Sequence, residues 1–159
     1  SWLITRQEQG LPIDRRQDMP HDAYWDPEEL LRSWARSKGS DQQCASDGLV
    51  LGPLSLVLVA VSLCWCSQGH PDPDCYHLRR IAMLLQAFAK FRQQNGSPWK
   101  DVAVFWDFPS LFQSPRTPLE DALFGLASGS MQLVYGHDLA MIWKLIAMPP
   151  CPQSLDAHR

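Results

Sequence analysis

The feature that most constrains this chain is an apolar run, residues 49–66, that carries no charged side chain. As a helix, a run of this length would span about 27 Å, close to the hydrocarbon thickness of a bilayer. As a strand, it would lie between two layers of helices, where both of its faces are covered. Val57, Val59 and Val61 recur at the spacing of side chains on one face of a strand. We therefore expect the central strand of a parallel sheet, with a transmembrane helix as the alternative.

Helix and strand signals alternate after this run. Residues 75–94 have the apolar period of a helix, and Asp74 is placed to cap it. Residues 102–106 follow as a second short apolar strand that ends at Asp107. The order strand, helix, strand favours a parallel pair joined by a right-handed crossover.

The last part of the domain adds a helix, a strand and a final helix to the expected fold. Thr117 and Glu120 have the capping-box spacing of a helix start, and we expect this helix to end near Gly129. Residues 131–135 then predict a third strand, and residues 139–147 predict the final helix. The predicted fold class is α/β: a small three-layer parallel sheet of about three strands with an N-terminal helical arm.

The segments outside this α/β domain, which we place at residues 49–148, are expected to be an arm and a tail. Residues 1–48 form the arm, extended over residues 1–19 and carrying a short helix at residues 27–37. Residues 149–159 form the tail. Five of the seven tryptophans are candidates for protein contact, because aromatic residues are enriched at binding hot spots: Trp2, Trp25, Trp34, Trp99 and Trp143.

Charge and cysteine content argue against several functional classes. The 159 residues include 14 basic and 17 acidic side chains, a net charge of −3, which provides no basic face for nucleic acid. The five cysteines do not form an even disulfide framework, so we expect an intracellular location, cytoplasmic or organellar. Cys64, Cys66, His70, Cys75 and His77 lack the usual zinc-site spacing, and we expect neither metal nor cofactor.

Polar residues follow the expected strands at their carboxyl ends, where open parallel sheets bind ligands. The candidate ligand-binding residues are Ser62, Trp65, Asp107, Ser110 and Tyr135. Asp107 and His137 are weak catalytic candidates, as a general base or ribose-binding group and as a proton shuttle. The alternative interpretation is that Asp107 bonds the backbone of its own turn and that His137 is an ordinary loop residue.

Four short motifs occur in order along the domain: Ser-Leu-Cys-Trp at residues 62–65, His-Pro-Asp-Pro at 70–73, Trp-Asp-Phe at 106–108 and Ser-Leu-Phe-Gln at 110–113. This series resembles a TIR-like α/β family that is common in algal and other protist genomes. Its members carry Ser-His-Arg-Trp, His-Pro-Asp-Pro, Trp-Asp-Tyr and Ser-Leu-Pro-Gln in these places. The resemblance implies a TIR-like or flavodoxin-like fold and, in the enzymatic members, cleavage of NAD.

The differences from the family pattern guide the functional hypothesis. Leu63 and Cys64 replace the polar His-Arg pair, and no glutamate maps onto the one that NAD-cleaving TIR enzymes use. We therefore expect a non-enzymatic interaction module or accessory subunit of a larger assembly, with other protein subunits as partners. One alternative is an enzyme that processes a nucleotide such as NAD. Another is a membrane-anchored subunit of an organellar, photosynthetic complex that spans the bilayer with residues 49–66.

Overall fold

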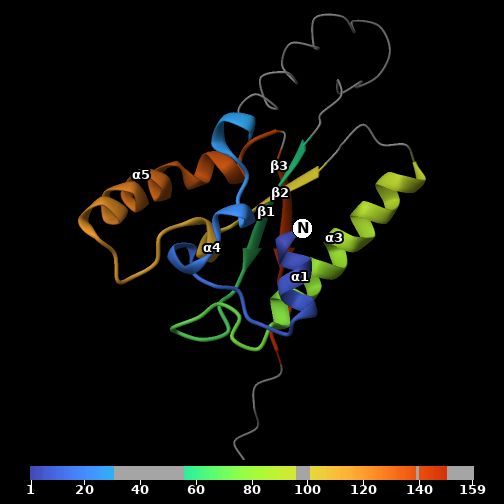
Figure 1. The fold of residues 1–159 in the computed structure, drawn as a ribbon, viewed down its shortest axis with the longest axis horizontal. Coiled ribbons are helices and arrows are strands. Elements are labelled where there is room, and N and C mark those ends of the chain that lie inside the picture. Colours follow the sequence, from blue (N-terminus) through green and yellow to red (C-terminus); the bar gives the residue numbers. More distant parts are fainter. Residues whose placement is uncertain (31–55, 96–100, 139, 150–159) are drawn as a thin grey trace, which may run out of the picture.

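The fold is built on a parallel sheet of three strands in the order β2-β1-β3 (Figure 1). The computed structural model describes residues 1–30, 56–95, 101–138 and 140–149. The strands are β1 (Leu56–Leu63), β2 (Asp101–Trp106) and β3 (Ala140–Leu145). Both outer strands run parallel to β1. The expected small parallel α/β fold is confirmed.

The central position of β1 explains the apolar run. Val57, Val59 and Val61 are 6%, 0% and 1% exposed and lie on one face of the sheet. Because both faces of β1 are covered, none of its side chains needs to be charged. Residues 56–63 of this run therefore form a strand, and the prediction of a transmembrane helix there is wrong. Among the described residues, no helix has the length and apolar character needed to cross a membrane.

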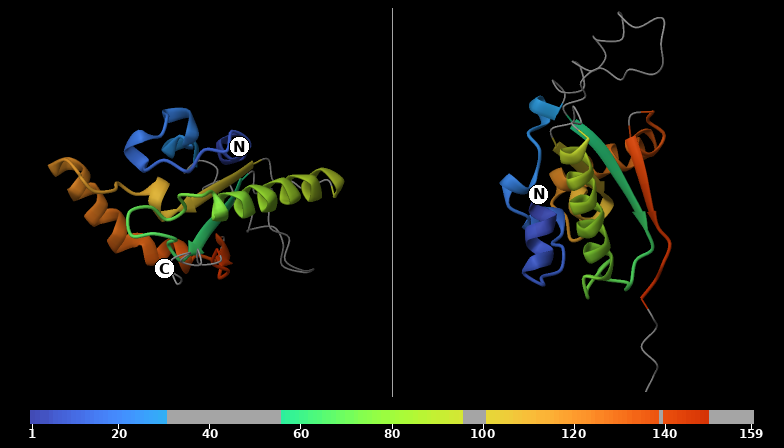
Figure 2. Two further views of the ribbon diagram at one scale, coloured as in Figure 1. Left: turned by 90° about the horizontal axis from the view of Figure 1, so that it is seen from below. Right: turned by 90° about the vertical axis from the view of Figure 1, so that its right-hand side faces the viewer.

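Two helices lie side by side on the valine face of the sheet (Figures 1 and 2). The longer, α3 (Tyr76–Gln94), buries Leu78, Ile81 and Leu85 against β1, as its apolar period predicts. The shorter, α1 (Trp2–Glu8), packs on α3. We expected this segment to be extended, and that prediction is wrong, because α3 provides an apolar surface for Trp2, Leu3 and Ile4.

The rest of the N-terminal arm passes around the outer edge of β2 to the opposite face. Two 3-10 turns, η1 (Arg16–Asp18) and η2 (His21–Ala23), lie along this path. The first of them contacts the short helix α4 (Asp107–Ser110). A helix begins at Pro27, where the Asp26 carboxylate accepts the Glu29 N–H at 2.9 Å. Residues 31–37, the rest of that predicted helix, and the tail beyond Pro149 lie outside the described residues.

The C-terminal third differs from the prediction in two places. Helix α5 (Pro118–Tyr135) starts at the expected capping box but continues through Gly129, so residues 131–135 are helix and not a third strand. The third strand is β3, formed by residues expected to be the last helix. Helix α5 contacts the second face of the sheet through Val134 and Tyr135, and most of its length projects away from the sheet (Figure 1).

Candidate functional site

The polar groups that follow β2 bond to their own backbone. The Asp107 carboxylate accepts the Phe108 N–H at 2.8 Å, and the Asp107 carbonyl accepts the Leu111 N–H at 2.8 Å. The Ser110 hydroxyl oxygen accepts the Trp106 N–H at 3.1 Å. These bonds form the turn that starts α4, so both side chains have the structural role that was the alternative for Asp107.

The residues that follow β1 form an aromatic cluster instead of a polar pocket. Trp65 is 39% exposed, and its ring meets Phe108 edge-on with centroids 5.7 Å apart. His70 contacts the same Phe108 ring at 4.8 Å. Ser62 is still inside β1, where it is in register with Lys144 of β3. This arrangement holds the loop after β1 against the loop after β2.

Tyr135 reaches the sheet from the end of a helix. Its hydroxyl donates to the Val61 carbonyl at 3.0 Å, and its ring meets Phe105 edge-on at 6.0 Å. Burial raises the pKa of the Tyr135 phenol above its usual 10.0, and the negative charge of Asp107 raises it further. Asp107 and Tyr135 are therefore close enough to interact electrostatically, although not through the strand geometry we expected.

His137 does not join them. It precedes β3, and its carbonyl accepts the Ala140 N–H at 2.9 Å. Because β3 runs parallel to β1, the start of β3 lies at the amino edge of the sheet, opposite the edge that carries Asp107. The expectation that His137 follows a strand at its carboxyl end is wrong, since the third strand begins after it.

The His-Pro-Asp-Pro loop has a structural task that the sequence assigned to the wrong aspartate. Asp72 is 0% exposed and accepts the N–H groups of His77 at 2.9 Å and Leu78 at 2.6 Å, which caps α3. Asp74, the predicted cap, is exposed. His70 accepts the Asp72 N–H through Nδ1 at 2.9 Å, so its Nε2–H donates to the Ile13 carbonyl at 2.8 Å.

The cysteines near this loop are free thiols: Cys64 is exposed, Cys66 is half-buried and Cys75 is buried. Burial raises the pKa of Cys66 and of Cys75 above 9.0, and the charge of Asp72 acts in the same direction. A raised pKa disfavours the thiolate that metal binding and nucleophilic attack require. Among the described residues, no three His, Cys, Asp or Glu side chains are grouped as a metal site would need.

One feature that sequence reasoning missed is a cavity of about 470 Å³ between the N-terminal arm and β2. Its lining includes every residue of β2 and reaches both faces of the sheet. On the arm it includes Trp2 and Leu3 of α1 and residues 22–26. The sequence did single out Trp2 and Trp25 as contact residues, but it carried no signal that they flank the same strand. We call this cavity the β2 groove.

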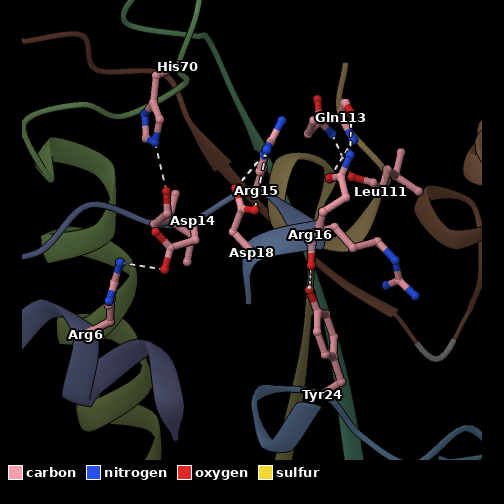
Figure 3. A network of polar contacts seen from close by, with 11 residues as sticks. Arg6, Asp14, Arg15, Arg16, Asp18, Tyr24, His70, Leu111 and Gln113 are labelled. Atoms are coloured by element: carbon pink, nitrogen blue, oxygen red, sulfur yellow. Dashed lines mark hydrogen bonds and ion pairs between the residues drawn. The ribbon is translucent and has the colours of Figure 1, made fainter. Parts of the chain in front are cut away.

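Polar contacts fix the arm beside the groove (Figure 3). Arg16 donates to the Ser110 carbonyl at 3.1 Å, and the Tyr24 hydroxyl lies 3.0 Å from the Pro109 carbonyl. The amide side chain of Gln17 donates to the Gln113 carbonyl and accepts the Gln113 N–H at 3.1 Å. Five separate atoms of the arm therefore hold to the loop after β2 or to His70, which makes the arm a wall of the groove.

Comparison of the chain with protein-family models, with curated proteins and with solved structures finds no match.

Proposed function

We propose that the protein is a non-enzymatic interaction module, an accessory subunit that binds an extended segment of another protein in the β2 groove. The observation that carries this proposal is the position of the groove, which follows all six residues of an edge strand. An edge strand offers backbone groups to a further strand, and many proteins recognise peptides in this way.

The backbone of β2 supports this mode of binding. The N–H groups of Val102 and Trp106 donate to the side chains of Asp101 and Ser110, outside the ladder with β1. Successive residues of a strand direct their N–H groups to opposite sides, so the Val104 N–H also faces outward. A bound strand could take this donor and the neighbouring outward carbonyls.

The groove walls suit an extended peptide. Its lining includes four aromatic residues that are not fully buried: Trp2, Tyr24, Trp25 and Phe105. The six residues of β2 extend about 20 Å, and the aromatic residues beside them offer apolar contacts to alternate side chains of a docked segment. The hydrogen bonds that Asp107 and Ser110 make to their own turn support a binding role over a catalytic one. The TIR-like resemblance of the motifs agrees with such a module.

Selection from a random peptide library displayed on phage tests the proposal. We expect enrichment on the wild-type protein and loss of binding in Val104→Pro, because proline removes the outward N–H and is tolerated on edge strands. The matched control is Val104→Ala, which also shortens the side chain but keeps the N–H and should still bind.

A second measurement needs no substitution. Hydrogen exchange of the Val104 amide should slow by about tenfold or more when a selected peptide is added, because the amide becomes hydrogen-bonded. No enrichment, or peptides that bind while this amide exchanges as before, would overturn the proposal.

A further inference from the structure

The side chains around the β2 groove carry charge of one sign. Asp22, Asp26, Glu29 and Asp101 are all exposed and all belong to its lining, which includes no lysine or arginine among the described residues. Asp101 starts β2, whereas the other three come from the arm on the opposite wall. A docked segment would therefore lie between carboxylates on both sides.

The position of these carboxylates along the groove indicates where they act. Asp26 and Glu29 are close in sequence to Leu30, which packs against Leu58 and Ala103 in the first half of the strand pair. Together with Asp101, they place the negative charge towards the amino end of β2. Complementary charge would favour cationic side chains on the part of a partner that lies there.

We infer that the partner segment is a basic extended peptide, with lysine or arginine side chains beside the acidic end of the β2 groove and apolar side chains against its aromatic walls. This inference rests on the proposed function, because it names the chemistry of the segment that pairs with β2. Side chains of a strand alternate between its two faces, so basic and apolar residues can alternate in such a peptide.

The inference predicts the composition of the selected peptides and the salt dependence of their binding. Peptides selected on the wild-type protein should be enriched in lysine and arginine. Replacing these residues by glutamine in a synthetic copy of the selected peptide should weaken binding about tenfold at low salt, the effect of one to two exposed charge pairs. The difference should shrink towards high salt, since exposed charges are screened within about 8 Å at physiological ionic strength.

Charge-neutral variants of the protein supply the matched test. Asp22→Asn, Asp26→Asn, Glu29→Gln and Asp101→Asn, combined in one chain, keep the side-chain shapes, and asparagine still caps the helix at position 26. This variant should bind the basic and the glutamine peptides equally. Glu8→Gln combined with Asp138→Asn changes charge outside the lining and should keep the preference.

The outcomes separate the two proposals. If peptides bind through the Val104 edge but basic and glutamine forms bind alike to the wild-type protein, the charge inference is wrong and the interaction module stands. Basic peptides could instead bind Val104→Pro as well as the wild type, and leave the Val104 amide of the wild type unprotected from exchange. In that case the strand-pairing function is wrong, and with it this inference.

Discussion

At the scale of single residues, the capping role of Asp72 leads to the clearest prediction about stability. Its buried carboxylate satisfies two N–H groups at the start of α3. Asp72→Ala should lower the free energy of unfolding by about 2–3 kcal/mol, since it removes a cap and leaves buried donors unpaired. Urea denaturation at neutral pH measures this change.

Two variants control the assignment of the cap. Asp72→Asn keeps one carbonyl acceptor and should lose about 1 kcal/mol. Asp74→Ala removes an exposed side chain and should change stability by no more than about 0.5 kcal/mol. A larger loss in Asp74→Ala than in Asp72→Ala would return the capping role to Asp74, as the sequence first indicated.

The raised pKa of Tyr135 leads us to expect that the protein loses stability in alkali. The pKa of this phenol is raised in the folded protein, so the native state keeps this proton to a higher pH than the unfolded chain does. The resulting stability is complete below about pH 10 and is lost as the pH rises through the folded pKa. Tyr135→Phe should be about 1 kcal/mol less stable at neutral pH, through loss of the bond to Val61, and should lose less in alkali.

Denaturant titrations of the wild type and of Tyr135→Phe at several pH values above neutrality test this prediction. Burial also raises the pKa of Tyr24, so Tyr24→Phe provides a comparison at a second site. Parallel alkaline stability curves for the wild type and Tyr135→Phe would contradict the assigned environment of Tyr135.

At the scale of elements, the continuation of α5 through Gly129 can be tested directly. A Cβ at Gly129 would meet nothing within 4 Å, and the residue lies inside the helix. Gly129→Ala should therefore stabilise the protein by about 0.5–1 kcal/mol, because alanine loses less backbone entropy in a helix. Thermal unfolding measures the shift.

Gly136 is the control for this substitution, since it follows the helix and a Cβ there would lie 3.2 Å from the Gln132 carbonyl oxygen. Gly136→Ala should give a smaller gain or a loss. If Gly129→Ala destabilised the protein as well, Gly129 would lie at a helix end, which is where the sequence pattern put it.

The exchange of strand and helix near the C-terminus has a physical cause. Alanine, methionine, lysine and leucine of β3 are good helix formers, and two prolines follow, so local propensity favours a helix there. Pairing with β1 decides otherwise, because β1 has two edges, and β3 covers the one that β2 leaves open. Packing on a neighbouring strand overrides weak local preference.

At the scale of the whole molecule, the N-terminal arm belongs to the core. Ile13 is 1% exposed and packs in the same cluster as Val59 and Ile81. Ile13→Ala should lower the free energy of unfolding by about 2–4 kcal/mol through loss of burial and creation of a cavity. Leu11→Ala, at a position 43% exposed, should cost about 0.5 kcal/mol or less.

Denaturation monitored by tryptophan fluorescence and by circular dichroism tests this role, because an integral arm unfolds in one transition with the sheet. Separate transitions, or an Ile13→Ala protein as stable as Leu11→Ala, would show that the arm is only loosely attached.

In the candidate site, local sequence patterns placed some residues correctly, whereas contacts between distant segments decided where the others lie. The sequence placed Asp107 and Ser110 after β2 correctly, because a strand and its following turn are local patterns. It did not place Tyr135 or His137, since both depended on where the third strand lies. It also named Trp2 and Trp25 as contact residues without bringing them to one strand, because about 75 residues separate β2 from Trp25 along the chain.

Local pattern determined the buried central strand, the long amphipathic helix α3 and the start of α5, because period and capping chemistry act within a few residues. Tertiary structure decided the third strand and the β2 groove. Each of these depends on which surface is left uncovered once β1 has been buried, and that surface exists only when distant segments meet.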